Sequence, residues 1–268
     1  MKHVLLGVFF LFLISNKLCA QHLFLLAGQS NANGQGDSKK SNLYSCDLAF
    51  EYDILLDTVK PLKDPAGQKW QLLEPANTGT ILPAFTKVFT SITKQSVTMV
   101  TASRGGSSCS QKAELSNYDT WDEKGNLFSQ AIEKTNHAIA KTKLQLNGII
   151  WMQGERDANA INDGKLKASE YQIALIGLIR RFRKQYGRKL PFYIIQTGYQ
   201  SARPKIGNDS IREVQFLVSK KLKHVFVVYD RTDTFFEKKW MKDNVHYNQE
   251  GLNDIGETTG AVIAKQHI

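Results

Sequence analysis

Ser30 stands directly after a short apolar run, in the segment Gly28-Gln29-Ser30-Asn31. A serine hydroxyl is a weak nucleophile until a base takes its proton. At the tip of a strand, on a turn that opens a helix, its backbone N–H can face a developing oxyanion. Serine is also a favoured helix N-cap residue, so the segment alone leaves a structural role open. A phosphate-binding loop is excluded, because no Gly-Lys-Ser/Thr follows and the glycine spacing of dinucleotide sites is absent.

His246 is the candidate base for this serine, because Asp243 precedes it by three positions. A carboxylate beside an imidazole holds its tautomer and stabilises the imidazolium that forms when serine loses its proton. An Asp-x-x-His pair by itself is equally compatible with a surface turn. A serine followed much later by such a pair is a more demanding coincidence, and it favours nucleophilic acyl transfer.

Two more polar segments with glycine follow apolar runs: Arg104-Gly105-Gly106-Ser107-Ser108 and Trp151-Met152-Gln153-Gly154-Glu155. Adjacent glycines let the backbone approach a ligand closely and present an N–H to it. The amide of Gln153 could supply another hydrogen-bond donor to an oxyanion. A purely structural protein has no reason to repeat this arrangement after three successive strands.

The segments that must position these residues alternate between strand and helix patterns. Short apolar runs rich in β-branched residues predict strands at 22–27, 96–102, 146–152, 191–197 and 225–229. Helical spacing or composition predicts helices around 128–139, 171–182, 82–93, 209–221 and 249–264. This alternation indicates an α/β fold with a parallel sheet, whose site lies at the carboxyl ends of the strands. The stretch 31–77 lacks clear periodicity and is interpreted as an irregular insertion near the site.

The first 20 residues have the composition of a secretory signal peptide. Lys2 and His3 precede an apolar run from Val4 to Ile14, and the small residue Ala20 ends the segment. The alternatives are a buried first strand or a membrane anchor, but the run is short for a bilayer span. We therefore expect a signal peptide over 1–20, a single domain over 21–268, and a secreted or periplasmic protein without stable membrane insertion after cleavage.

The formal net charge of +10 comes from scattered basic residues. The densest group, between Arg180 and Lys189, alternates with apolar residues at helical spacing and is typical of the solvated face of a helix. No aromatic or base-reading motif accompanies it, so we expect no nucleic-acid partner.

Cysteine and histidine usage gives no sign of a metal site. Once Cys19 leaves with the signal, Cys46 and Cys109 remain, and they form either one disulfide or two separate buried thiols. Four histidines stand apart from any ligand cluster, at positions 22, 137, 224 and 267.

Four segments in register resemble the SGNH (GDSL-like) hydrolases, and within them the sialate O-acetylesterase and acetylxylan esterase branch, carbohydrate esterase family 6. The segments are AGQSNANGQG at 27–36, RGGSS at 104–108, WMQGERDA at 151–158 and DNVHYNQEGL at 243–252. The resemblance spans nearly all of the mature chain. It implies a three-layer α/β/α, flavodoxin-like fold, here with a five-stranded parallel sheet, and chemistry that needs no metal or organic cofactor.

The resemblance also implies roles for individual residues. Ser30 would be the nucleophile, His246 the base and Asp243 its orienting carboxylate, with Glu155 as the alternative carboxylate partner of His246. The oxyanion hole would combine the N–H of Ser30, an N–H of Gly105 or Gly106, and the side chain of Gln153. The residues implied to bind substrate are Gln29, Asn31 and Arg104.

The resemblance implies an acetylated carbohydrate as substrate, and the residues leave open which sugar carries the ester. No long apolar stripe accompanies Ser30 that would hold a fatty chain. Trp121, Tyr118 and Tyr44 are candidates for stacking on sugar rings, although buried aromatics explain such residues more often. The alternatives are a lipase or thioesterase of the same superfamily, and a glycan-binding protein that keeps the fold without catalysis.

Overall fold

The computed structural model describes residues 22–268, and all of its named strands join one sheet. The signal peptide expected over 1–20 lies outside these residues. The sheet order is β3-β2-β4-β1-β5-β6-β7. The strands are β1 (His22–Gly28), β2 (Ala49–Asp53), β3 (Thr58–Pro61), β4 (Val97–Ser103), β5 (Leu146–Met152), β6 (Phe192–Ile195) and β7 (Val225–Tyr229).

Helices fill most of the connections between these strands. The long ones are α3 (Leu82–Thr93), α4 (Leu127–Thr142), α6 (Ala168–Tyr186), α7 (Lys205–Lys221) and α8 (Gln249–Ala264). The short ones are α1 (Ser30–Asn33), α2 (Ser38–Ser41) and α5 (Glu155–Asn162), with 3-10 turns η1 (Asn42–Tyr44), η2 (Gln111–Ala113) and η3 (Arg231–Thr234). The five helices expected from the sequence are all present, as α3, α4, α6, α7 and α8. Across the described residues, no helix combines the length and apolar character needed to cross a membrane.

The five strands expected from the sequence form the parallel centre of the sheet, in the order β4-β1-β5-β6-β7. Counted along the chain, that is the flavodoxin order 2-1-3-4-5. The expectation of five strands in total is wrong, because a hairpin extends the sheet beyond β4. Strand β2 pairs parallel with β4, and β3 closes the edge antiparallel to β2. The stretch 31–77 is thus partly regular, which corrects its interpretation as an irregular insertion.

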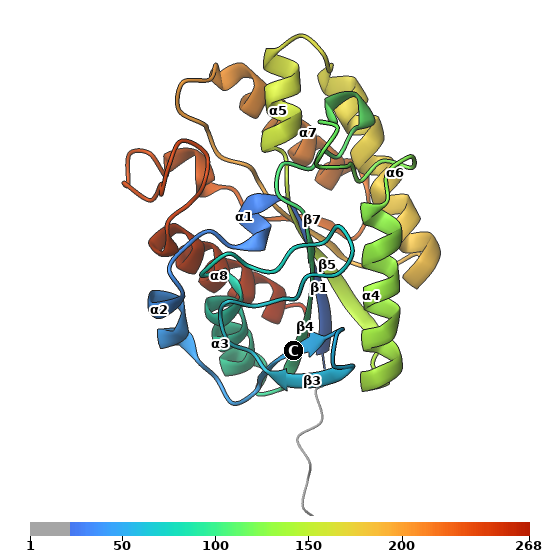
Figure 1. Ribbon diagram of the computed structural model, residues 1–268, viewed down its shortest axis with the longest axis vertical. Helices are drawn as coiled ribbons and strands as arrows, with labels where there is room; N and C mark the ends of the chain where they lie inside the picture. The colour runs from blue at the N-terminus through green and yellow to red at the C-terminus, as the bar shows by residue number, and fades with distance from the viewer. Residues whose placement is uncertain (1–21) are drawn as a thin grey trace, which may run out of the picture.

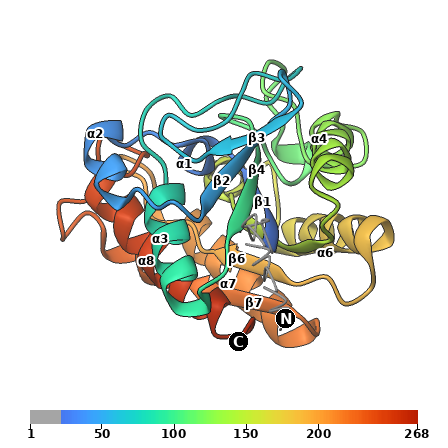
Figure 2. The same cartoon turned by 90° about the horizontal axis from the view of Figure 1, so that it is seen from below.

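Alternate side chains of the central strands enter two separate apolar cores, one on each face of the sheet. In β1, Leu23 and Leu25 face the core that includes α4, α6 and α7, whereas Phe24 and Leu26 face the core that includes α3 and α8. Figure 2 shows α3 and α8 on one side of the sheet and α4 and α6 on the other. The molecule is therefore layered as helix, sheet and helix, because both sheet faces are apolar and each must be covered.

The two remaining cysteines belong to different layers. Cys46 packs at the edge of the core that holds α3 and α8, and Cys109 is buried in the opposite core. Both are free thiols, so of the two alternatives left open by the sequence the structure has the separate thiols.

The carboxyl ends of β1, β4 and β5 meet at one edge of the sheet, next to the short helix α1 (Figure 1). Gly28 at the end of β1 is level with Ser103 of β4 and with Met152 of β5. A Cβ atom at Gly28 would lie 2.0 Å from the carbonyl oxygen of Met152, so only glycine allows this close approach. The loops that begin with Gln29, Arg104 and Gln153 therefore start side by side.

The β2–β3 hairpin covers a buried charge cluster beneath the sheet edge. Lys134 of α4 is fully buried, and its Nζ has no hydrogen-bond partner among the described residues. Burial lowers the pKa of Lys134 to about 8, although the neighbouring carboxylates Glu51 and Asp53 oppose the shift. Lys60 forms ion pairs with both of these carboxylates, at 3.4 and 2.7 Å. Lys134 thus adds a positive charge to a cluster whose acids already have a partner.

We predict that Lys134→Met stabilises the protein at neutral pH by about 1–3 kcal/mol, because a buried charge is replaced by an apolar side chain of similar length. The folded-state pKa lies below the unfolded value, so the destabilisation by Lys134 is complete below about pH 8 and disappears as the pH rises through the unfolded pKa. Urea unfolding at pH 7 and at pH 10 measures both effects. Lys141→Met, on the exposed face of the same helix, is the matched control. The prediction is contradicted if Lys134→Met does not raise the free energy of unfolding at pH 7, or if Lys141→Met raises it equally.

Candidate active site

Ser30 and His246 lie 216 positions apart in sequence, and the fold brings their side chains into hydrogen-bond contact. His246 Nε2 is 3.0 Å from Ser30 Oγ, and His246 Nδ1 is 2.8 Å from Asp243 Oδ2. Ser30 is the first residue of α1, directly after β1, and His246 belongs to the loop that precedes α8. The three side chains form a continuous line from hydroxyl to imidazole to carboxylate.

The loop that carries His246 is shaped by Asp243 itself. Asp243 Oδ1 accepts hydrogen bonds from the backbone N–H groups of Val245 and His246, at 2.9 and 2.8 Å, while Oδ2 contacts the imidazole. Partial burial raises the pKa of Asp243, but these hydrogen bonds outweigh it and the pKa lies below the ordinary value. The carboxylate therefore stays ionised when it is needed to stabilise an imidazolium.

Asn31 fastens the nucleophile turn to the histidine loop. Its Oδ1 accepts from the N–H of Tyr247 at 3.1 Å, and its Nδ2 donates to the carbonyl of Val245 at 3.2 Å and to Glu155 Oε1 at 2.6 Å. These two bonds to the loop flank His246 on both sides. Asn31 was expected to bind substrate; the structure buries it, 1% exposed, in this connecting role.

Glu155, the alternative partner of His246, makes its hydrogen bond to Asn31 instead. Its carboxylate is buried, and burial raises its pKa, an effect that the bond from Asn31 partly opposes. Of the two carboxylates considered from the sequence, Asp243 is the one in direct contact with the imidazole.

A pocket of about 470 Å³ opens onto Ser30 and His246. The other residues that line it are Gln29, Gln35, Glu74, Gly105, Gly106, Leu115, Tyr118, Glu155, Arg156, Asn159, Gln200 and Val245. A larger cavity of about 650 Å³ lies along β7 and the end of α7, and it contains none of the candidate catalytic residues.

Gln153 lies beneath this pocket and does not line it. It is 1% exposed, and its Nε2 donates to Asp157 Oδ2 at 2.6 Å and to Gln29 Oε1 at 3.2 Å. Gln29 Oε1 also accepts from the N–H groups of Gly154 and Arg156, both at 3.3 Å. The amide proposed from the sequence as an oxyanion donor is therefore committed to a buried network, and Gln29 lines the pocket with its oxygen already engaged.

The other side of the pocket is held by a carboxylate that the sequence analysis did not single out. Glu74 forms an ion pair with Arg104, and its Oε2 accepts from the N–H of Gly105 at 2.8 Å and from Asn33 Nδ2 at 3.2 Å. Arg104, expected to bind substrate, also donates to the carbonyl of Asn117 at 3.0 Å. The signal for Glu74 was weak, because it lies in a loop far from every motif.

The three aromatic residues considered for sugar stacking differ in their accessibility. Tyr118 lines the pocket, is 41% exposed, and has the Arg104 guanidinium over its ring at 5.9 Å. Trp121 is fully buried and donates to Ser107 Oγ, and Tyr44 lies away from the pocket beneath Lys87. Only Tyr118 of these three is placed to meet a ligand.

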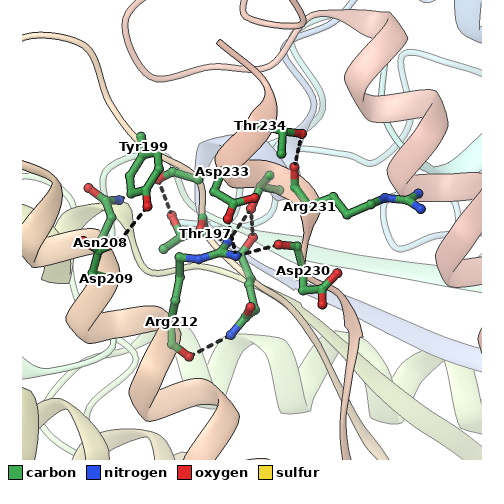
Figure 3. Close-up of polar contacts among 12 residues, drawn as sticks. Thr197, Tyr199, Asn208, Asp209, Arg212, Asp230, Arg231, Asp233 and Thr234 are labelled. Atoms are coloured by element: carbon green, nitrogen blue, oxygen red, sulfur yellow. Dashed lines mark hydrogen bonds and ion pairs between the residues drawn. The ribbon is translucent and has the colours of Figure 1, made fainter. Parts of the chain in front are cut away.

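The loops after β6 and β7 are pinned by Arg212 of α7. Its guanidinium donates to the carbonyls of Thr197 and Asp230, at 2.9 and 2.6 Å, and to Asp233 Oδ2 at 3.1 Å, as Figure 3 shows. The hydroxyl of Tyr247, next to His246, accepts from the N–H of Gly198 in the loop after β6, at 2.8 Å. The histidine loop is thus hydrogen-bonded to the loop after β6, which Arg212 joins to the loop after β7 at the carboxyl end of the sheet.

This arrangement can perform nucleophilic acyl transfer, because a hydroxyl, an imidazole and an ionised carboxylate are aligned in an open pocket. Among residues 22–268, no group of three or more metal-ligating side chains is positioned to hold a metal ion.

The family model described as "carbohydrate esterase, sialic acid-specific acetylesterase" matches residues 20–265. The chain belongs to this family. It is therefore a carboxylic ester hydrolase. Membership of this family supports the assignment of the chain as a carbohydrate acetylesterase. A comparison with curated protein sequences finds no match.

Solved structures of low sequence identity share the fold of this esterase. A protein from Arabidopsis thaliana has a TM-score of 0.70 at 17% identity, over 93% of this chain and 100% of its own. NanS has a TM-score of 0.63 at 12% identity, over 93% and 98%. XAC1771, a carbohydrate acetylesterase from Xanthomonas citri, has a TM-score of 0.60 at 19% identity, over 91% of this chain and 56% of that one.

We predict that Asp243→Asn lowers kcat by about 10³–10⁴-fold, because an amide cannot hold the imidazole tautomer that accepts the serine proton. Glu155→Gln is the matched control: it also neutralises a carboxylate near the site, but that carboxylate bonds Asn31 rather than His246. We expect the control to lose less than about tenfold, the size of one neutral hydrogen bond. Hydrolysis of p-nitrophenyl acetate measures both variants, and the opposite ranking would assign the orienting role to Glu155.

Proposed function

We propose that this esterase removes O-acetyl groups from carbohydrates by an acyl-enzyme mechanism in which Ser30 is the nucleophile, His246 the general base and Asp243 its orienting carboxylate. The observation that carries the proposal is the contact of 3.0 Å between His246 Nε2 and Ser30 Oγ, with Asp243 on the opposite ring nitrogen. The arrangement has the geometry of a serine triad.

In the first step, Ser30 Oγ attacks the acetyl carbonyl carbon while His246 Nε2 takes the hydroxyl proton. The carbonyl electron pair moves to the oxygen, which becomes the oxyanion of a tetrahedral intermediate. When the intermediate collapses, the bond from the carbonyl carbon to the sugar oxygen breaks and His246 gives its proton to the leaving hydroxyl. Water then repeats these steps on the acetyl-serine, which releases acetate and restores Ser30.

One residue of the pocket wall, Arg156, supports a proposal about which acetylated sugar is bound. Arg156 lines it and donates from Nε to the carbonyl of Ala113 at 2.6 Å. No ion pair joins Arg156 to a carboxylate in the described part of the chain, whereas Arg104 is paired with Glu74. An arginine with free guanidinium N–H groups at a pocket wall favours a ligand that carries a carboxylate. Together with the family description, this supports an acetylated acidic sugar of the sialic acid type.

Ser30→Ala tests the proposed mechanism. We expect kcat to fall by about 10⁴–10⁶-fold, because no other group in the triad supplies the nucleophile. Acetate release from O-acetylated sialic acid and from acetylated xylan is the measurement, with circular dichroism as a check of folding. Wild-type hydrolysis of p-nitrophenyl octanoate faster than of the acetate would instead favour a lipase or thioesterase, and a folded Ser30→Ala variant that still releases acetate would exclude Ser30 as the nucleophile.

Arg156→Met tests the acidic-sugar specificity. We expect KM for O-acetylated sialic acid to rise about tenfold, because one charged hydrogen bond to a partly exposed carboxylate contributes roughly 1.5 kcal/mol. The change on neutral p-nitrophenyl acetate should be smaller. Arg156→Lys keeps the charge and serves as the control. Equal changes on the neutral and the acidic ester would show that Arg156 does not read a carboxylate.

A further inference from the structure

A basic surface at the ends of α6 and α7 takes no part in the acyl transfer. The cavity of about 650 Å³ along β7, here called the α7 hollow, has Lys220, Lys221 and Lys223 in its wall. A second cavity of about 520 Å³, the α6 hollow, is lined by Arg180, Arg183, Lys184, Gly187 and Arg188. Helices α6 and α7 each end just before the next strand begins, so these residues lie near the amino ends of β6 and β7. Ser30 follows the carboxyl end of β1, at the opposite edge of the sheet.

Arg183 joins the two hollows. Its guanidinium donates from Nη2 to the carbonyls of Lys223 and His224, at 2.7 and 2.9 Å. Both acceptor residues line the α7 hollow, whereas Arg183 itself lines the α6 hollow, so the two hollows share a wall. Helices α6 and α7 also pack against each other. A ligand in the form of an extended chain can therefore contact both hollows at once.

The positive charge of this surface is not balanced by neighbouring acids. The sequence has no Asp or Glu between Glu170 and Asp209, and none between Glu213 and Asp230. Within residues 22–268, no ion pair includes a lysine or arginine of either hollow. Asp230, at the far end of β7, is the one acid among the residues that line them. Unpaired cations that surround a concave surface concentrate anions there.

Helix stabilisation explains only part of this arrangement. Cations in the last turn of a helix interact favourably with its negative end, and Lys220 and Lys221 occupy that position in α7. The effect falls off within the last turn, so it does not extend to Arg180, which lies more than one turn before the end of α6. Arg180 is exposed, and its charge is directed to solvent or to a ligand.

An accessible aromatic ring lies among the cations of the α7 hollow. Phe216 lines this hollow and is 50% exposed, and Lys220 Nζ lies 5.0 Å from the centre of its ring. The neighbouring Leu217 is 45% exposed but does not line the hollow. Aromatic faces stack on sugar rings, and lysine and arginine bind carboxylates. An aromatic ring surrounded by cations therefore suits a chain of acidic sugars.

We propose that a polysaccharide with carboxylates on successive sugars binds across the α6 and α7 hollows, at a surface separate from the catalytic pocket. Membership of a carbohydrate esterase family and the exposed ring favour a glycan over a nucleic acid. The concave shape favours a chain over a flat lipid surface. The inference goes beyond the proposed function and does not depend on it, because binding at this surface needs no acyl transfer.

Phe216→Ala tests whether a sugar ring stacks in the α7 hollow, and Leu217→Ala is the matched control. We expect Phe216→Ala to raise Kd for polysialic acid without acetyl groups about tenfold, because the stacking contact is lost while every charge remains. Leu217→Ala should leave Kd near the wild-type value. Isothermal titration calorimetry measures both, and thermal melting checks that both variants are folded. Wild-type affinity in folded Phe216→Ala, or an equal loss in Leu217→Ala, would overturn the inference.

The triple variant Lys220→Gln, Lys221→Gln and Lys223→Gln tests the charge of the same hollow. We expect Kd for polysialic acid to rise about tenfold, and added NaCl to weaken wild-type binding because it screens exposed charges. The control removes three exposed lysines that line neither hollow, by Lys39→Gln, Lys69→Gln and Lys124→Gln. An equal loss of affinity in this control would show that net charge alone attracts the polymer.

Other ligands test the class of partner. Neutral dextran should not bind, whereas equally tight binding of single-stranded DNA or of phosphatidylserine vesicles, weakened by the same variants, would overturn the assignment to a glycan. Ser30→Ala should bind polysialic acid as the wild type does, and Phe216→Ala should hydrolyse p-nitrophenyl acetate normally. An active esterase that does not bind the polymer thus refutes this inference alone. Polymer binding by a wild-type protein without esterase activity refutes only the proposed function.

Discussion

The geometry of this site depends on the side chain of Asn31, which holds two distant parts of the chain in register. Its amide bonds the backbone on both sides of His246, and its nitrogen also bonds the buried carboxylate of Glu155. Other bonds hold the histidine loop as well, from Ser201 N–H to the carbonyl of Asn244 and from Gly198 N–H to the hydroxyl of Tyr247, but the bonds of Asn31 are the ones that join it to the nucleophile turn. A catalytic contact tolerates displacement of only a fraction of an ångström, so the position of the histidine loop relative to Ser30 must be fixed by such side-chain bonds.

The support for this connection comes from the parallel sheet. Strand β1 is fully buried between β4 and β5, and its last residue is level with the ends of both neighbours. Three loops therefore begin at the same level of the sheet: the one that carries the nucleophile, the one with the glycine pair after β4, and the one with Gln153 after β5. Rigid strands fix where each loop begins, and the side-chain bonds between loops fix where the functional atoms lie.

The parts of the fold that could be predicted are those in which burial leaves a pattern in the sequence. The five central strands read as apolar runs because both of their faces are covered, and α3 and α8 were predicted with the bounds that the structure has. The β2–β3 hairpin was missed because Glu51 and Asp53 interrupt its apolar character. Their charges are balanced by Lys60 across the hairpin, a pairing that only the folded chain reveals.

In the candidate site, too, some side chains could be predicted from the sequence and others could not. Ser30, His246 and Asp243 were identified because their chemistry and order are specific, and their contacts follow from where the strands end. The placement of Gln153 could not be predicted, because its amide donates to Asp157, which lies four residues later in the first turn of α5. The contacts of Asn33 could not be predicted either, because its partners Ser103 and Glu74 come from two other segments of the chain.

Three carboxylates lie near the nucleophile, and their surroundings give each a different part. Asp243 is partly exposed and held by two backbone N–H groups, so it stays charged and orients the imidazole. Glu155 is buried against Asn31, where burial raises its pKa, and it anchors the loop connection. Glu74 lines the pocket, where it pairs with Arg104 and accepts from the N–H of Gly105, so it holds the loop that follows β4. Identical functional groups thus acquire separate roles through burial and hydrogen bonding, as paired acids do in other hydrolases.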